Sequence, residues 1–421
     1  MLQRHRPILY ALLLALALIL KMGYRHRLGM ETVPAWGDAV DYDNLGLSLA
    51  RGHGFSVDFQ DPEFQAPYRN SGFSSLYDNY YRLEARGLTM FRPPLFPWLV
   101  SGHYAAFGRH YTPVRITQFL LTAVSLALVF FLLWRHSPAT AIFYALVALF
   151  EPTLARHAVN LLTEPLAAAM LCAWFACELL PHRYAAAAAG FFAGLLLLAR
   201  PIFAIGLALA LLVKAAAQKS LRGAILTGVV ATMTCLPFMI RNCRLSHRFT
   251  PFGTHGTIML AYAYSDASYQ NGHVDFTTTP LVYKDANPSG PNALLVSELT
   301  IADAEGKTFR QWLGKNFWKV PYLVLSRILE NFTPSNFGEA MVLLFSMLGL
   351  GAVRTSPIAR LAALFLLYNT AGVALMWAHG NRFNFPVLPL QYVLVAYGLQ
   401  AAFAFAKGLK TRKPSVSSTR A

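Results

Sequence analysis

The chain has 421 residues, of which 55% are hydrophobic and only 13% charged, with a mean hydropathy of +0.41. Soluble domains typically carry about 25% charged residues, and a soluble chain of this length would divide into domains of about 150 residues. Here the apolar residues form long unbroken blocks instead. This composition excludes an ordinary soluble protein and predicts an all-α polytopic membrane protein.

Ten blocks are long enough to be transmembrane helices, because a bilayer core of about 30 Å needs roughly 20 apolar residues, or fewer where the membrane thins. The first block follows Arg4 and Arg6, as the apolar part of a signal peptide would. No small-x-small cleavage site comes after it, so we interpret it as an uncleaved helix. The stretch 95–107 contains Pro97 and Gly102 and is shorter, which favours an interfacial helix over a span. The ten predicted spans are 7–22, 113–134, 139–154, 160–180, 184–200, 201–217, 223–240, 338–353, 358–377 and 385–406.

The distribution of charge gives the orientation. With ten spans and an inner N-terminus, the cytoplasmic segments hold 14 of the 36 basic residues and one acidic residue, Glu178. A spanning 95–107 would turn the basic C-terminal tail outward, against the positive-inside rule. The formal net charge of +16 therefore indicates membrane orientation and not nucleic-acid binding. We expect one membrane domain over 1–406 with outer loops at 23–112 and 241–337, and a basic cytoplasmic tail at 407–421.

Cysteine and histidine usage argues against two kinds of site. The four cysteines lie in or beside apolar blocks, which excludes a disulfide framework and a cysteine-based zinc site. Histidines 53, 255, 273 and 379 lack the spacings of zinc-binding motifs. The cysteines are Cys172, Cys177, Cys235 and Cys243.

Three aspartates, Asp38, Asp41 and Asp43, lie close together in the first outer loop. The leucines that follow predict a short amphipathic helix starting near Asp38 or Asp41, where an acid can cap backbone N–H groups. A carboxylate at the membrane face can also act as a general base toward a hydroxyl group. The pair Asp41 and Asp43 forms a D-x-D pattern that can hold a metal and a nucleotide diphosphate, although nucleotide sugars are cytosolic. A divalent cation therefore stays open as an alternative, and no other cofactor is expected.

Arg92 precedes two prolines that fix an extended entry into the interfacial helix. Its side chain can either snorkel among lipid phosphates or form a fork-shaped clamp on one specific phosphate.

Further polar residues occur on the same outer face. Glu164 lies in a Thr-Glu-Pro segment that starts a span, where helix capping is the simplest explanation. A lone arginine at the membrane interface usually anchors a helix. Four arginines on the same side of the membrane as one acid-rich loop, counting Arg92, instead indicate a binding site. Tyr68, Tyr77, Tyr80 and Tyr81 form either a sugar platform or an interfacial belt. The remaining candidates for substrate binding are Arg200, Arg241, His379 and Arg382.

The order of these motifs resembles that of bacterial multi-spanning glycosyltransferases with the GT-C fold. Within them it is similar to the family that includes protein O-mannosyltransferase-like and aminoarabinose-transferase-like enzymes. The resemblance covers nearly the full chain, although Ala39 follows Asp38 where family members often have a second acid. The matching segments are Asp38-x-x-x-Tyr42, Gly52-x-Gly54-Phe55, Arg92-Pro-Pro-Leu95, Thr163-Glu-Pro165, Ala199-Arg-Pro201, Arg241-Asn242 and Arg382-Phe-x-x-Pro-x-x-Pro389.

The resemblance implies transfer of a sugar from a polyprenyl-phosphate donor to a lipid, glycan or protein acceptor. It places the protein in a bacterial inner membrane with the site facing outward, Asp38 as the catalytic residue and Arg92 on the lipid phosphate. The chemistry agrees, since a prenyl phosphate needs cations to leave and an acceptor hydroxyl needs a base. A single direct attack would invert C1, because no second carboxylate is clearly placed as a nucleophile. A transporter or flippase of lipid-linked saccharides is the alternative, but its charges would lie in mid-bilayer helices and its chain often carries a repeat.

Overall fold

Helices dominate the computed structural model, and its only strands within the described residues form one two-stranded sheet. In the described part of the chain, six helices are long and apolar enough to cross a membrane. The predicted all-α polytopic membrane architecture is therefore confirmed. The structure describes residues 2–26, 29–34, 37–71, 85–154, 158–179, 182–272, 292–376 and 382–411.

Each of the ten predicted spans coincides with a helix. Four of these helices, α7, α9, α10 and α11, are only 13 to 16 residues long. A fifth, α17, has 13 residues and reaches 18 only together with η3. The number of ten crossings therefore stays a prediction. The bounds are α1 (Leu2–His26), α6 (Tyr111–His136), α7 (Pro138–Phe150), α9 (Glu164–Leu179), α10 (Ala185–Ala199), α11 (Ala204–Gln218), α12 (Arg222–Ser246), α17 (Phe337–Gly349), α18 (Pro357–Met376) and α19 (Leu388–Thr411). Short 3₁₀ turns connect some of them: η1 (Pro201–Phe203), η3 (Leu350–Arg354) and η4 (Arg382–Val387).

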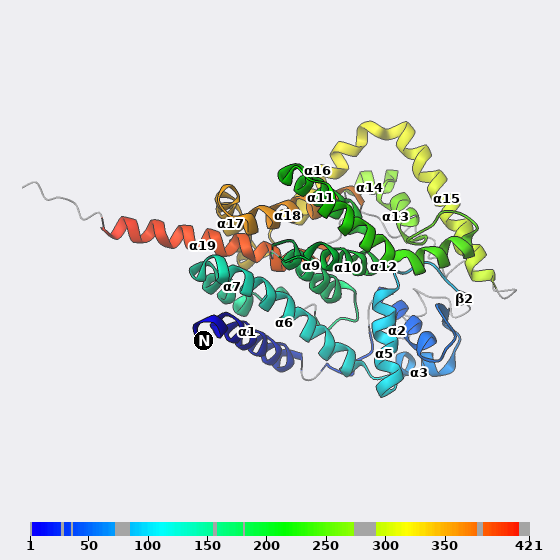
Figure 1. Cartoon of the computed structure of the whole chain (residues 1–421). Coiled ribbons are helices and arrows are strands. Elements are labelled where there is room, and N and C mark those ends of the chain that lie inside the picture. The colour runs from blue at the N-terminus through cyan, green and yellow to red at the C-terminus, as the bar shows by residue number, and fades with distance from the viewer. Residues whose placement is uncertain are drawn as a thin grey trace, which may run out of the picture.

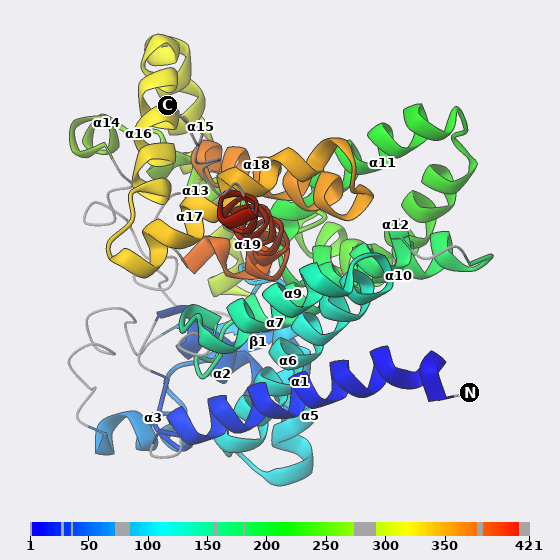
Figure 2. The ribbon, with the colours of Figure 1, turned by 90° about the vertical axis from the view of Figure 1, so that its left-hand side faces the viewer.

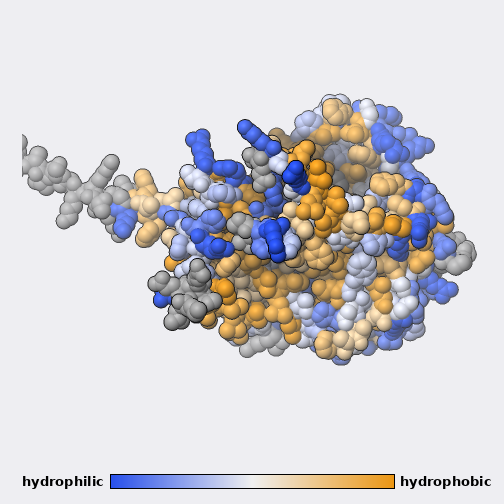
Figure 3. Space-filling view, viewed as in Figure 1, coloured by the Kyte–Doolittle hydropathy of each residue, from blue (hydrophilic) through white to orange (hydrophobic). Residues whose placement is uncertain are grey.

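The bundle has two distinct ends. The start of α1 and the far end of α19 lie at the same end of the molecule (Figure 1). Viewed along the bundle, α19 is seen end-on near the centre (Figure 2). On the face shown in Figure 3, hydrophobic residues gather across the middle, and hydrophilic residues are more frequent toward both ends. An even number of crossings is expected to give this placement of the two ends.

Small residues allow some helices to pack closely. A Cβ atom on Gly190 of α10 would lie 2.6 Å from the carbonyl oxygen of Thr227 on α12. One on Gly194 would lie 2.5 Å from the Cβ atom of Thr234. Glycines at helix crossings allow the backbones to approach within van der Waals contact in a lipid environment. All four cysteines are free, as expected.

The opposite end of the bundle is built from the two predicted outer loops. One buried apolar cluster contains Phe59 and Phe64 from the first loop together with Ile258 and Leu294 from the second, so the two loops fold as one unit. The predicted interfacial helix at 95–107 is α5, with the same bounds. The first loop contributes α2 (Gly37–Ala50), β1 (Ser56–Asp58), α3 (Pro62–Asn70), β2 (Arg86–Leu88) and α5 (Leu95–Phe107). The second contributes α13 (His255–Ala263), α14 (Asp266–Asn271), α15 (Ala293–Asn316), η2 (Phe317–Lys319) and α16 (Val320–Phe332).

Candidate functional site

The start of α2 presents two carboxylates on one face. Asp38 and Asp41 are three residues apart, a spacing that makes them neighbours on a helix surface. Asp38 also lies where the helix dipole favours negative charge. The side chain of Asp38 is 32% exposed, whereas that of Asp41 is 1% exposed. The two carboxylates are therefore a pair with one accessible and one enclosed member.

Arg92 binds both carboxylates. Its Nη2 donates to Oδ1 of Asp38 at 2.7 Å, and its Nε donates to Oδ2 of Asp41 at 2.7 Å. The guanidinium is nearly enclosed and lies 4.7 Å from the ring centroid of Phe91. Two carboxylates against one guanidinium leave this trio with an excess negative charge. The predicted clamp of Arg92 on a lipid phosphate therefore has to share the side chain with two aspartates.

His255 brings the second outer loop into the same cluster. Its Nε2 lies 3.2 Å from Nη1 of Arg92, and its ring lies 4.8 Å from that of Phe91. A guanidinium has donors only, so Nε2 accepts this hydrogen bond and the imidazole proton is on Nδ1. From the sequence, His255 is a candidate only for zinc binding, and it lacks the spacing for that. Its contact with Arg92 could not be predicted from a local pattern, because the two residues are 163 positions apart in the chain.

Glu164 and Arg200 form a second buried ion pair. Oε1 of Glu164 lies 3.2 Å from Nη1 of Arg200, and both side chains are almost fully enclosed. Glu164 begins α9, and the carbonyl of Thr163 accepts the first helical hydrogen bond from Ala167, as the capping interpretation expects. Arg200 follows the last residue of α10 with an extended backbone. Glu164 thus lies in the first turn of α9, as a helix-capping role requires, and also forms an ion pair with Arg200.

The buried hydroxyl of Tyr42 is within electrostatic range of both clusters. Burial raises the pKa of its hydroxyl to about 12, and the charges of both clusters act on it. The charged residues within electrostatic reach of its hydroxyl are Arg92, Asp38, Glu164 and Arg200. Four residues that were predicted for the site from separate parts of the chain therefore act electrostatically on one buried side chain.

Arg241 is engaged by the backbone of the first loop. It donates to the carbonyl oxygens of Phe55 at 3.1 Å and Thr89 at 3.0 Å. Its guanidinium also packs on the rings of Phe55 and Phe238. These contacts hold the chain just before Arg92, and its predicted contact with substrate stays a prediction.

Two further predicted site residues lie at or beyond the limits of the description. His379 falls outside the described residues. Arg382 begins η4, but its side chain is not among those described.

The third aspartate of α2 is a buried carboxylate that connects this helix to its neighbours. Asp43 is fully buried and accepts hydrogen bonds from the hydroxyls of Tyr68, Tyr104 and Tyr111. Nη2 of Arg109 completes an ion pair with it at 2.6 Å. Burial, followed by the negative charge of Asp43, raises the pKa of Tyr68 and Tyr104 well above the usual value.

This network corrects two expectations. Tyr68 is neither a sugar platform nor part of an interfacial belt, because its ring is buried and its hydroxyl is committed to Asp43; Tyr77, Tyr80 and Tyr81 fall outside the described residues. The D-x-D pattern is also divided, since Asp41 and Asp43 bind different arginines. Across the described ranges, no three His, Cys, Asp or Glu side chains are grouped to hold a metal.

Glu298 of α15 fixes the segment that leads to Arg92. Its fully buried carboxylate accepts from the Thr89 hydroxyl at 2.8 Å, from the Met90 amide at 3.1 Å and from the hydroxyl of Thr254. Burial raises the pKa of Glu298 despite these hydrogen bonds. The adjacent Gly253 has a φ of +86°, and a Cβ atom there would lie 1.9 Å from the carbonyl oxygen of Met90. The two loops are thus locked together immediately before Arg92.

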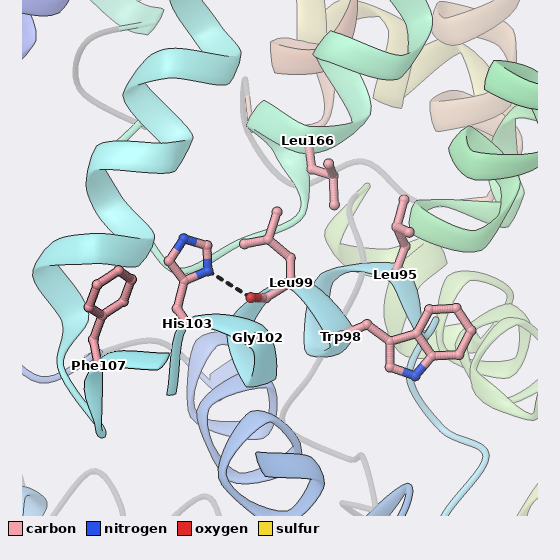
Figure 4. A pocket seen from close by; sticks show the side chains of 7 residues that line it. All are labelled: Leu95, Trp98, Leu99, Gly102, His103, Phe107 and Leu166. Atoms are coloured by element: carbon pink, nitrogen blue, oxygen red, sulfur yellow. Dashed lines mark hydrogen bonds between the residues drawn. The ribbon is translucent and has the colours of Figure 1, made fainter. Parts of the chain in front are cut away.

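An apolar hollow of about 440 Å³ lies along α5 (Figure 4). It is bounded on one side by Leu166, two residues after Glu164, and on the other by the helix that follows Arg92. His103 is the one ionisable residue in its lining, and it donates from Nδ1 to the Leu99 carbonyl at 2.8 Å. The lining residues are Leu95, Trp98, Leu99, Gly102, His103, Phe107 and Leu166.

No family model matches the sequence, and no curated protein matches it. Among solved structures, the chain is similar to the crystal structure of ArnT from Cupriavidus metallidurans bound to undecaprenyl phosphate. The two are 13% identical with a TM-score of 0.43, over 97% of this chain and 80% of that chain. A likeness this distant does not establish a shared function.

Proposed function

We propose that this protein is an integral membrane glycosyltransferase that moves a sugar from a polyprenyl-phosphate donor to an acceptor hydroxyl on the extracytoplasmic side. The supporting observation is that two ion-paired clusters, one from the first outer loop and one from the ends of α9 and α10, lie within electrostatic range of the same buried hydroxyl, that of Tyr42. The order of motifs along the sequence supports the same class of enzyme.

Asp38 is the better candidate for the base. It is the exposed member of the carboxylate pair and makes one short contact with Arg92. Asp41 is enclosed and is bound by both Nε and Nη2 of Arg92. A general base must reach the hydroxyl from which it takes the proton, and only the exposed carboxylate can do so without rearrangement of the site. We therefore assign Asp41 to holding Arg92.

The transfer step is a single displacement. Asp38 accepts the proton of the acceptor hydroxyl while the oxygen of that hydroxyl forms a bond to C1 of the sugar. The bond from C1 to the phosphate oxygen breaks, and the electron pair leaves with the polyprenyl phosphate. Cations near the leaving oxygen stabilise the developing charge, and a direct displacement inverts C1.

The donor would lie between these charges and the apolar hollow along α5. The hollow is lined by aliphatic and aromatic side chains and opens next to the segment that carries Arg92. An isoprenoid chain is itself apolar, so its burial there would be favourable. Arg92 and Arg382 are the proposed ligands of the phosphate, and unchanged binding of polyprenyl phosphate in Arg92→Ala and Arg382→Ala variants would remove both from that role.

The test is a comparison of lipids and glycans from a strain that lacks the gene with those from its parent. We expect the mutant strain to accumulate a polyprenyl-phosphate sugar and to lose one sugar from an envelope component. Purified protein should then convert that accumulated lipid to polyprenyl phosphate in detergent. An unchanged lipid-linked pool and glycan profile would contradict the proposal. Accumulation without conversion by the purified protein would favour a transporter.

A further inference from the structure

α16 and the 3₁₀ turn before it, η2, carry apolar side chains on their outer surface. On α16 these residues recur every three or four positions, a spacing that puts them on one face of the helix. Trp318 of η2 precedes them, and all five side chains are between 39% and 68% exposed. The residues on the helix are Tyr322, Leu325, Leu329 and Phe332.

The opposite face of α16 is buried and contains polar side chains. Leu323, Arg327 and Asn331, four residues apart, lie on this face. Arg327 is fully buried and donates to the carbonyl of Ala374 on α18 at 3.1 Å and to that of Ala263 at the end of α13. A helix at a water boundary buries its apolar face and exposes its polar one. α16 has the reverse arrangement, which indicates that its outer face does not border water.

We propose that η2 and α16 lie in the outer interface of the bilayer, with the apolar stripe among lipid chains and the basic segment before it against anionic headgroups. α16 has 13 residues, too few to span a membrane but typical of a helix that lies along its surface. It is at the edge of the molecule, away from the central α19 (Figure 2).

The charge of the neighbouring sequence favours a lipid surface. Residues 306–329 include five basic residues and no acidic one. Three of the five, Lys307, Arg310 and Lys315, are exposed on α15. Trp318 and Tyr322 are the residue types that gather at headgroup depth. A second copy of this chain on the stripe would bring two like-charged segments together, which is unfavourable.

Quenching of Trp318 tests the proposal in the full-length protein. The protein is placed in nanodiscs of phosphatidylcholine and phosphatidylglycerol, and the Trp318→Phe spectrum is subtracted to isolate one fluorophore. We expect lipids brominated near the headgroup to quench Trp318 and aqueous iodide to leave it nearly unaffected. Trp312, buried on α15, is the matched control, and its difference spectrum should respond less to both quenchers.

The headgroup preference is measured by comparing two nanodisc preparations, one in which only phosphatidylglycerol is brominated and one in which only phosphatidylcholine is. Brominated phosphatidylglycerol should be enriched at Trp318 by at least about fivefold, the effect of one basic residue near an anionic surface. The triple variant Lys307→Gln, Arg310→Gln, Lys315→Gln should lose that enrichment without losing bromine quenching.

Three outcomes would overturn the proposal, and none depends on the transfer reaction. Quenching by iodide alone would place the stripe in water. Resistance to both quenchers together with a cross-linked dimer would place a second copy on it. Equal quenching by the two brominated lipids would show that the segment has no preference for anionic headgroups.

Discussion

Arg92 is the counter-ion of two carboxylates, one of which is fully enclosed. Its removal should therefore lower the stability of the protein as well as its activity. Arg92→Ala leaves Asp41 buried without its partner, and breaking a buried pair in this way costs about 3–5 kcal/mol. Arg92→Lys keeps the charge but has no planar fork to reach Asp38, Asp41 and His255 together, so it should be intermediate. Thermal unfolding in detergent measures both.

The control for Arg92 is Arg51, which pairs with Asp61 and Glu63 at the surface. Arg51→Ala should cost at most about 1 kcal/mol, as exposed ion pairs do. Equal destabilisation by Arg51→Ala and Arg92→Ala would contradict the picture of Arg92 as a buried counter-ion.

Asp43 contributes to the site by holding α2, the helix that carries Asp38 and Asp41, against its neighbours. Asp43→Asn leaves Arg109 without its buried anion and weakens hydrogen bonds to Tyr68 and Tyr104. We expect a loss of about 3–5 kcal/mol in the free energy of unfolding, with transfer reduced in proportion to the folded fraction. The measurement is unfolding and activity on one preparation. A stable Asp43→Asn protein that binds the donor but does not turn over would instead make Asp43 a catalytic group.

At the scale of elements, the clamp between α15 and the segment before Arg92 should give a pH signature. The pKa of Glu298 is raised by burial, so its contribution to stability is fully present below the ordinary glutamate pKa of about 4.5 and is lost as pH rises through the folded-state value. Glu298→Gln cannot titrate. The difference in unfolding free energy between wild type and variant should therefore fall as pH rises from about 4.5 toward neutrality, as measured by denaturation at several pH values. A difference that is independent of pH would contradict this assignment.

Helices were easier to predict than the contacts between them. All ten predicted spans and the segment 95–107 coincide with helices, because apolar block length and proline and glycine positions are local properties. The pairing of Asp38 and Asp41 with Arg92 crosses about 50 positions, and that of Arg92 with His255 crosses 163. Contacts between residues so far apart in the chain cannot be predicted from local sequence patterns. For the same reason Asp38, Arg92, Glu164 and Arg200 stand out in the sequence as separate candidates but not as ion pairs, and nothing local marks Glu298 as a buried clamp.

At the scale of the whole molecule, both termini should be cytoplasmic. The charge count along the chain predicts it, and the start of α1 and the end of α19 lie at the same end of the bundle (Figure 1). Reporter fusions after Lys410 should be active only as cytoplasmic reporters, and fusions within 255–300 only as extracytoplasmic ones. An outward-facing tail would contradict the ten-span arrangement.

The most direct test of the account is the rate of sugar transfer by Asp38→Asn, measured with reconstituted protein beside wild type and Asp41→Asn. Asparagine keeps the size of aspartate and some capping ability, so a helix-capping role predicts a small loss of stability and little loss of rate. A general base predicts a loss of about 10²–10⁴ in rate. The account predicts a normally inserted Asp38→Asn protein with transfer reduced at least about a hundredfold, and a smaller loss per folded molecule for Asp41→Asn. Near wild-type transfer by Asp38→Asn would contradict it, and would move the base to Asp41 or Glu164.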